Sequence, residues 1–309
     1  MSKAQVIHKL GPPAAMQWED WPVPDPAPGE VRLRHTAVGV NYADTYHRGG
    51  ISHPWPVPPC PVVIGFEGVG VVEGLGEGVS SFKPGDRVAY GIPPLGSYAE
   101  ARNYPADKLL HLPEALDDRK VAALLMKGMT AQYLLHRTYK VQPGDTILVH
   151  AAAGGMGLIL CQWARALGAT IVGTVSTEEK AEAARAAGCD YPVVRSKESF
   201  VAKVKEVTNG EGAAVVYEAI GKDTLQASLD SLRLMGVCAA YGHVSGPPDP
   251  VDIIQDLGRR GSLFITRPAI MHYLAKRSDL EWAARDLFKA IGDGILDANI
   301  NYEYPLKDA

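Results

Sequence analysis

Cysteine is scarce in this chain of 309 residues, which contains only four, at Cys60, Cys161, Cys189 and Cys238. No two of them form a C-x-x-C pair. The spacing therefore favours neither a disulfide framework nor a thiolate zinc cluster. This usage argues against a small disulfide-held secreted domain and fits a reducing compartment.

Long apolar runs and clusters of one charge are also missing. No stretch approaches the roughly 18 apolar residues that span a bilayer, and the N-terminus lacks the basic-then-apolar order of a signal peptide. The chain has 31 Lys and Arg against 35 Asp and Glu, a formal charge of −4. This balance argues against a polybasic nucleic-acid binder. We expect a cytoplasmic protein with neither a nucleic-acid nor a membrane partner.

The first part of the chain, residues 1–124, has the texture of a mainly β domain. Short β-branched segments alternate with Gly and Pro, which is typical of strands joined by tight turns. The predicted strands are 31–38, 62–72, 87–90 and 98–101. Five prolines within 52–61 predict an extended loop. We favour a stiff connector over a lid for that loop.

From about residue 125 the pattern changes to alternating helices and strands, which predicts a doubly wound parallel sheet over 125–266. The predicted helices are 121–139, 158–167, 178–188, one from about 199, and 224–234. The predicted strands are 146–150, 170–175, 192–194, 213–218, 236–241 and 262–266. The remainder, 267–309, predicts a helix at 280–294 and a strand-like end that packs back on the first domain. The fold class is therefore α/β with two domains.

A glycine cluster joins the predicted strand 146–150 to the following helix. It aligns with the dinucleotide fingerprint as Ala152-x-Gly154-x-x-Gly157, with Ala in place of the first Gly. Glycine lets the backbone approach a pyrophosphate, and the helix N-terminus offers amide groups to it. A tight turn without a ligand is the alternative, which the surrounding α/β alternation disfavours. The predicted cradle is Ala153, Gly154, Gly155, Met156 and Gly157.

The end of the next predicted strand indicates which nicotinamide cofactor is used. An NAD site needs Asp or Glu at the strand tip, whereas this chain has Ser176 and Thr177 there, followed by two glutamates and Lys180. Lys180 can pair with a 2′-phosphate, so we predict NADPH. The alternative is that Lys180 is a solvated residue paired with a neighbouring Glu.

Several stretches together resemble the zeta-crystallin-like NADPH:quinone oxidoreductases of the zinc-free medium-chain dehydrogenase/reductase superfamily. They are GVNYADTYHRGG (39–50), GFEGVGVV (65–72), PGDRVAY (84–90), LLMKGMTAQYLL (124–135), HAAAGGMGLILCQWARALGA (150–169), VYEAIGKDT (216–224), FITRP (264–268) and YPLKDA (304–309). The resemblance implies a GroES-like mainly-β catalytic domain beside a Rossmann cofactor domain. Family members continue past PLKDA, so it also implies that the catalytic domain here lacks its final helix and strand.

The resemblance also implies roles for individual residues. Asn41, Tyr46 and Arg48 would be catalytic, lining the pocket beside the nicotinamide. Asp44 would hold a ribose hydroxyl or, equally, cap a helical turn. The remaining implied cofactor-binding residues are Lys127 and Thr130 near the nicotinamide, Ser176, Lys180 and Tyr191 around the 2′-phosphate, Tyr241, Gly242 and His243 near the diphosphate or adenosine, and Phe264.

A zinc enzyme of this superfamily would have Cys near Asn41, His at the position of Phe66, and a four-Cys loop between 90 and 115. None of these is present, and zinc needs three or four protein ligands. We therefore predict a metal-free reductase in which hydride passes directly from nicotinamide carbon 4 to a quinone.

Two other functions stay open. The same cofactor geometry suits reduction of the double bond of an enone or 2-alkenal. A non-catalytic NADPH- or RNA-binding role, as in crystallin relatives, is the third reading, which the acidic balance disfavours. We also expect a homodimer, because the apolar strand 262–266 would otherwise leave a sheet edge exposed.

Overall fold

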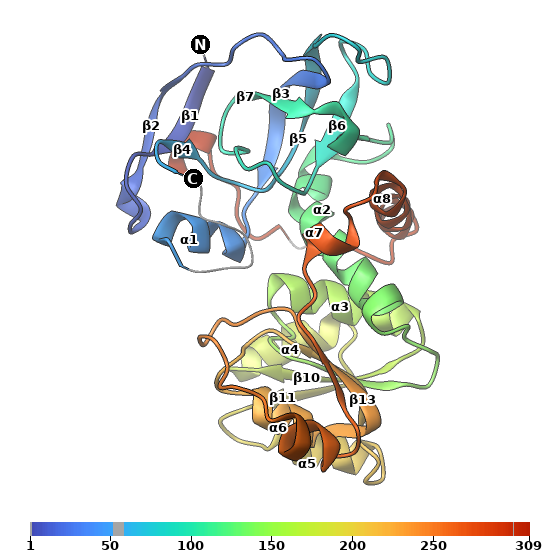
Figure 1. Cartoon of the computed structure of the whole chain (residues 1–309). Coiled ribbons are helices and arrows are strands. Elements are labelled where there is room, and N and C mark those ends of the chain that lie inside the picture. Colours follow the sequence, from blue (N-terminus) through green and yellow to red (C-terminus); the bar gives the residue numbers. More distant parts are fainter. Residues whose placement is uncertain (1, 52–58, 299) are drawn as a thin grey trace. The chain divides into compact units, whose positions relative to one another are not determined.

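A computed structural model describes residues 2–51, 59–298 and 300–309. The chain forms two compact units (Figure 1). The first unit comprises Met1–Met126, Leu274–Gly292 and Asp297–Ala309, and the second comprises Lys127–Tyr273 and Asp293–Leu296. Most of the proline-rich stretch 52–61, for which we predicted an extended loop, lies outside the described residues.

The first unit is built on two antiparallel sheets, as the β-branched segments predicted. The larger has the strand order β7-β3-β5-β6-β8 and the smaller β2-β1-β4. Alternate side chains of the larger sheet, such as Val31, Leu33 and Val88, pack with Phe82 into one buried cluster. The strands are β1 Ser2–Ile7, β2 Met16–Trp21, β3 Glu30–Gly39, β4 Val62–Val63, β5 Glu67–Leu75, β6 Arg87–Tyr90, β7 Ala101–Pro105 and β8 Leu110–His111.

Helices and short turns complete the first unit. They are α1 Tyr42–Gly49, the first part of α2 Asp118–Tyr133, α8 Arg277–Gly292, and the 3-10 turns Pro13–Ala15, Ala106–Lys108 and Leu306–Asp308. The C-terminal residues lie against β1, because the side chain of Gln5 donates a hydrogen bond of 2.6 Å to the carbonyl of Lys307.

The second unit is a parallel sheet with helices on both faces, which confirms the α/β fold class. The strand order β11-β10-β9-β12-β13-β14 is that of a doubly wound sheet. In Figure 1, α3 and α4 lie on one face and α5 and α6 on the other. The strands are β9 Thr146–Val149, β10 Thr170–Val175, β11 Tyr191–Val194, β12 Ala213–Glu218, β13 Leu232–Ala240 and β14 Phe264–Thr266. The helices are α3 Gly155–Ala166, α4 Glu178–Ala186, α5 Phe200–Val207, α6 Leu225–Asp230, α7 Ile270–Tyr273, the end of α2, and the π-helices Leu134–Thr138 and Ile253–Gly258.

Four predicted elements need correction. The helix predicted for 224–234 ends at Asp230, because β13 begins at Leu232, which pairs with Ala213. The strand predicted for 62–72 is two strands, interrupted at Gly65, whose φ of 102° breaks the extended run. Among the described residues of 295–309 no strand forms, and a 3-10 turn stands at the end.

The fourth correction concerns the strand predicted for 98–101. The strand β7 begins only at Ala101, and before it Ala99 makes an isolated bridge to Ala4 of β1. The apolar residues Tyr98 and Ala99 are buried against the smaller sheet rather than paired in the larger one. Their apolar character therefore reflects burial in a loop.

Candidate cofactor and active site

The predicted phosphate cradle lies at the carboxyl end of β9. The chain leaves β9, adopts a left-handed conformation at Ala151 (φ 52°), and enters α3 at Gly155. A Cβ at Gly157 would clash with the carbonyl oxygen of Ala151 and would stand 2.6 Å from the Cα of Ala152. Glycine is therefore required for α3 to begin this close to the strand. We call residues 151–157 the glycine loop.

The first-turn amides of α3 point out of the glycine loop with no intrahelical acceptor, as at every helix start. They can bind an anion together with the positive end of the helix dipole. A cation stands next to them, because the side chain of Lys127 packs against Gly155, with its Cδ 3.3 Å from where a Cβ would be. This arrangement fits a pyrophosphate.

Tyr241 and Gly242, which follow β13, adjoin the same edge of the sheet. A Cβ at Gly242 would stand 2.6 Å from the carbonyl oxygen of Ala219, so only glycine allows these two loops to touch. The Tyr241 hydroxyl is buried and has no hydrogen-bond partner among the described residues. Burial, followed by the charge of Glu218, raises the pKa of Tyr241. The hydroxyl therefore stays protonated and can donate to a ligand.

His243 and Phe264 were predicted cofactor residues near this edge. Burial, and then the charge of Arg267, lowers the pKa of His243, so its imidazole is neutral at pH 7. Phe264 is 59% exposed and pairs with Val237, near the start of β14. The register thus separates Phe264 from the carboxyl ends of the strands, where the glycine loop lies.

Ser176 and Lys180 form the expected pair beyond β10. The Lys180 ammonium donates a hydrogen bond of 3.2 Å to the Ser176 hydroxyl. Its backbone N–H donates to the Thr177 hydroxyl, which caps the start of α4. Glu178 pairs instead with Lys197 at 2.6 Å. The alternative in which Lys180 pairs with a neighbouring Glu is therefore not the arrangement found.

Tyr191, the third residue expected around the 2′-phosphate, does not lie beside this pair. It begins β11, opposite Val172, whereas Ser176 follows the last residue of β10. Four residues of strand separate the two levels, or about 13 Å at 3.3 Å per residue. The expectation for Tyr191 came from family resemblance, and the register of β11 sets its backbone about four residues from the level of Ser176.

Arg195 occupies the level that Tyr191 was expected to fill. Its backbone N–H donates a hydrogen bond of 3.1 Å to the carbonyl of Val175, which precedes Ser176. The residue is exposed, and no ion pair involves it within the described part of the chain. Arg195 could not be predicted from the sequence because the register of a strand is not visible in its own residues. Its position just after a β-branched run was the available signal.

In the first unit, Asp44 caps helix α1. Its carboxylate accepts hydrogen bonds from the backbone N–H of Asn41 at 2.8 Å and from the Tyr98 hydroxyl at 2.9 Å. Asp44 is 3% exposed. Burial, and then the neighbouring Asp44, raises the pKa of Tyr98, so its hydroxyl remains a donor. Of the two roles weighed for Asp44, the structure shows the cap, and the contact with a ribose hydroxyl stays a prediction.

The Asn41 side chain is held by a buried carboxylate. Glu67 is fully buried, and one of its oxygens accepts from the Asn41 amide at 2.6 Å while the other accepts from the Met126 backbone N–H at 2.7 Å. A Cβ at Gly39 would overlap the Glu67 carboxylate. No role was predicted for Glu67 from the sequence, and the signal for it was the glycine required at position 39.

The other two predicted catalytic residues lie on α1 with Asn41 at its N-cap. Tyr46 is 8% exposed and meets Tyr42 edge to face, with ring centroids 5.3 Å apart. Arg48 donates through Nε to the carbonyl of Gly11 at 3.3 Å. One short helix therefore presents all three side chains.

At the positions where a zinc enzyme would have ligands, this unit has Asn41 and Phe66, and both oxygens of Glu67 hold amides. Phe66 is fully buried and packs against the ring of His47 at 5.0 Å. Within residues 2–51, 59–298 and 300–309, no group of three His, Cys, Asp or Glu side chains is arranged to hold a metal ion.

Comparisons with known proteins agree with both units. The family model of the alcohol dehydrogenase GroES-like domain matches residues 27–114, and that of the zinc-binding dehydrogenase matches residues 155–284. A 2-haloacrylate reductase from Burkholderia sp is 55% identical over all of this chain and 93% of its own length. A quinone oxidoreductase from Pseudomonas aeruginosa is 42% identical over all of this chain and 94% of its own length.

Two solved structures are also similar to this chain. The crystal structure of a 2-haloacrylate reductase superposes with a TM-score of 0.90 at 53% identity, covering 99% of this chain and 92% of the other. The Escherichia coli quinone oxidoreductase complexed with NADPH gives 0.93 at 39% identity, covering 99% and 93%. The chain belongs to the NADPH:quinone oxidoreductase family of the medium-chain dehydrogenase/reductase superfamily, and it is an oxidoreductase. No helix in the described ranges is both long enough and apolar enough to cross a membrane.

Proposed function

We propose that this enzyme uses NADPH to reduce a quinone without a metal ion. The observation that carries the proposal is the carboxyl edge of the parallel sheet, where a glycine-built cradle stands beside Lys127 and where Ser176, Lys180 and Arg195 offer a hydroxyl and two cations. A pyrophosphate fits the first group and a 2′-phosphate the second. When bound, NADPH supplies the hydride.

The residues of α1 supply the other half of the proposed chemistry. Without a metal, the acceptor oxygen must be polarised by hydrogen-bond donors placed where charge develops. Asn41 and Tyr46 carry such donors, and Glu67 fixes the orientation of the Asn41 amide through a charge-assisted hydrogen bond. Arg48 adds a positive charge that can stabilise the negative charge developing on the acceptor oxygen.

A second substrate class has a specific observation in its favour. The relative at 55% identity is a 2-haloacrylate reductase, which is more similar to this chain than the quinone oxidoreductases at 40 to 42%. Reduction of an electron-poor carbon–carbon double bond needs the same hydride donor. Arg48 could then pair with a substrate carboxylate, a contact for which guanidinium is suited.

A substrate panel distinguishes these two classes. The oxidation of NADPH is followed at constant enzyme with para- and ortho-quinones, 2-alkenals and 2-haloacrylates. Turnover of quinones supports the leading proposal. Rapid turnover of 2-haloacrylates or alkenals, with no turnover of quinones, would replace it by the double-bond reductase. An enzyme that binds NADPH and turns over none of them would favour the non-catalytic reading.

The proposal includes a homodimer formed through the edge of the parallel sheet. β14 pairs with β13 on one side and ends the sheet on the other. Large apolar side chains near that edge are exposed, namely Leu234, Met235, Ile253, Ile254 and Phe264. An unpaired strand beside apolar surface invites association. Gel filtration at micromolar concentration should give a dimer, and a species of 33 kDa would contradict it.

A further inference from the structure

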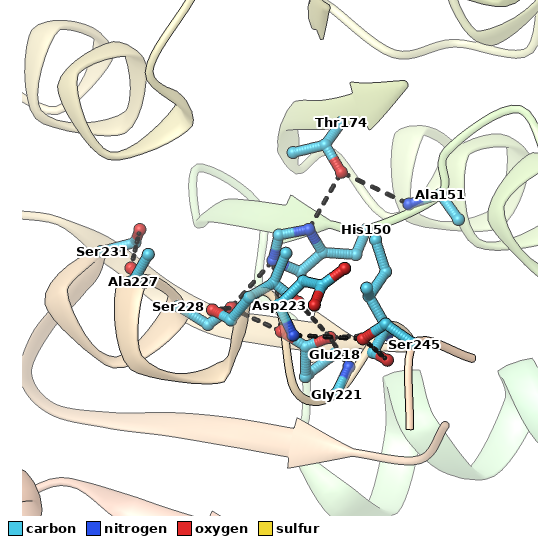
Figure 2. Close-up of polar contacts among 12 residues, drawn as sticks. His150, Ala151, Thr174, Glu218, Gly221, Asp223, Ala227, Ser228, Ser231 and Ser245 are labelled. Atoms are coloured by element: carbon cyan, nitrogen blue, oxygen red, sulfur yellow. Dashed lines mark hydrogen bonds and ion pairs between the residues drawn. The ribbon is translucent and has the colours of Figure 1, made fainter. Parts of the chain in front are cut away.

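A buried polar network lies beneath the cofactor edge (Figure 2). Its members are fully or almost fully buried, and they come from four elements of the second unit: His150 at the end of β9, Thr174 of β10, Glu218 of β12, and Thr224 and Ser228 at α6. β9 and β12 are the two strands at which the order of the sheet reverses, where ligands bind in doubly wound folds.

The protons of this network can be placed by counting donors. The Ser228 hydroxyl has one proton but lies 2.6 Å from a Glu218 oxygen, 2.8 Å from the Thr224 carbonyl and 2.9 Å from Nε2 of His150. The first two partners only accept, so Nε2 of His150 must be the atom that donates to Ser228. Nδ1 then accepts from the Thr174 hydroxyl at 2.9 Å.

The charges agree with this assignment. Burial lowers the pKa of His150, and this effect outweighs the opposing charge of Glu218, so the imidazole is neutral. Burial alone would raise the pKa of Glu218, but the hydrogen bonds that its carboxylate accepts from Ser228, Gly221 and Ile220 hold that pKa below its ordinary value. The hydrogen bonds therefore all point the same way from donor to acceptor, from Thr174 to His150, from His150 to Ser228, and from Ser228 to the Glu218 carboxylate.

Both ends of this chain of hydrogen bonds hold loops of the cofactor edge. At one end, the side-chain oxygen of Thr174 accepts from the N–H of Ala151 at 3.4 Å and its carbonyl accepts from Ala152 at 2.9 Å, which ties down the start of the glycine loop. At the other end, the second oxygen of Glu218 accepts from the N–H groups of Ile220 and Gly221 at 2.6 and 3.0 Å.

The loop 219–224 is in turn joined to the loop 241–246. The Ser245 hydroxyl donates to the carbonyl of Ile220 at 2.8 Å and accepts from the N–H of Asp223 at 3.1 Å (Figure 2). A Cβ at Gly221 would stand 2.6 Å from the carbonyl oxygen of Gly246, so these loops are in direct backbone contact. The buried network thus connects three loops that are far apart in the sequence.

We propose that His150, Ser228 and Glu218 form a positioning relay, which runs from Thr174 to the loop 219–224 and holds the glycine loop in the conformation that binds the pyrophosphate of NADPH. The inference rests on the proposed function, because it assigns the relay to the cofactor used there. The relay residues are buried beneath the loops, so they act through the backbone and not by contact with the ligand.

The test uses two variants that remove one hydroxyl each, Ser228→Ala and Thr174→Val, and the double variant. A matched control is Ser231→Ala, because Ser231 is also buried next to α6 but its hydroxyl donates only to the carbonyl of Ala227 at 2.9 Å (Figure 2). Direct binding is measured through the fluorescence of bound NADPH. Adenosine 2′-monophosphate, which lacks the pyrophosphate, is measured by competition.

Each relay variant should weaken NADPH binding by about tenfold, or about 1.4 kcal/mol, and leave the affinity for adenosine 2′-monophosphate within about twofold. The double variant should lose no more than the stronger single one, because both break one relay. Ser231→Ala should bind both ligands normally. A general loss of structure would instead lower the affinities for both ligands. The losses of the two single variants would then add in the double variant, and Ser231→Ala would show a similar loss.

A second measurement needs no cofactor. Nitrogen-15 NMR of histidine-labelled wild type at pH 7 should show a neutral His150 with its proton on Nε2. A proton on Nδ1, or unchanged NADPH affinity in both variants, would overturn the relay alone. If the wild type does not bind NADPH at all, the proposed function fails and the relay fails with it. Normal NADPH binding by the wild type together with unchanged binding by both variants would exclude the relay and leave the proposed function intact.

Discussion

Backbone atoms form most of the cofactor edge in the second unit, whereas side chains form the Asn41 region in the first. At the cofactor edge, glycines at 157, 221 and 242 let loops touch where a Cβ would overlap. In the Asn41 region, Glu67 orients Asn41 and Asp44 caps α1. Backbone sites depend on conformation and tolerate no added atom, whereas side-chain sites depend on particular donors and acceptors.

The largest effect should follow from adding one methyl group to the glycine loop. Gly157→Ala places a Cβ on the Ala151 carbonyl and 2.6 Å from the Cα of Ala152, both rigid backbone. We expect NADPH binding to be lost and the unfolding free energy to fall by about 1 to 3 kcal/mol, as for overpacked sites. Fluorescence titration and urea unfolding measure the two. Gly292→Ala, with no atom within 4 Å of its Cβ, is the control and should change neither.

Removing a cation from the 2′-phosphate site should change cofactor choice. Lys180→Ala and Arg195→Ala should each weaken NADPH binding about ten- to a hundredfold, because a charged hydrogen bond contributes about 1.5 to 3 kcal/mol. NADH binding should stay the same. Lys197→Ala, two residues from Arg195 and paired with Glu178, should be neutral for both cofactors. An equal fall in the affinity for NADH would show that neither residue binds the 2′-phosphate.

Acid should destabilise the first unit through His35. This partly buried imidazole contacts the Ala99 carbonyl at 2.5 Å and the Tyr90 hydroxyl at 2.8 Å, and the loss of solvation lowers its pKa to about 3. The unfolded state therefore binds more protons between about pH 6.5 and 3, so stability falls as the pH falls through that window. At pH 5 the loss relative to pH 7 is about 2 kcal/mol.

Urea unfolding at both pH values measures this loss. His35→Gln keeps a donor and an acceptor but cannot be protonated, so its stability should change less between pH 7 and 5 than that of the wild type. An equal change in both proteins would show that His35 is not the titrating group.

The smallest effect should come from the carboxylate behind Asn41. Glu67→Gln is isosteric but replaces one acceptor oxygen by an NH2 group, which is a donor. This NH2 group must face either the Asn41 amide donor or the Met126 N–H, so one hydrogen bond is lost. We expect turnover to fall by about fivefold, or about 1 kcal/mol, with NADPH affinity unchanged. Steady-state kinetics and titration separate the two. A fall in NADPH affinity with turnover intact would contradict this role.

Local patterns predicted much of this protein. The spacing of Gly154 and Gly157 between a strand and a helix predicted the glycine loop, because the strand, turn and helix are contiguous in sequence. Lys180 was predicted because the tip of the following strand lacks the acid that an NAD site needs, and the family resemblance added Ser176 beside it. Predictions failed where strand pairing decided the outcome, as at Leu232, which pairs with Ala213 and begins β13 within the predicted helix.

What the sequence alone determined is the class of each element and the chemistry at each loop, because hydrophobic period, glycine and charge act within a few residues of chain. What only the tertiary structure decided is which distant residues meet: Arg195 in place of Tyr191 beside Ser176, Glu67 behind Asn41, and His150 between Thr174 and Ser228. Strand register and burial set those meetings. Both depend on contacts between segments that the chain order does not place together.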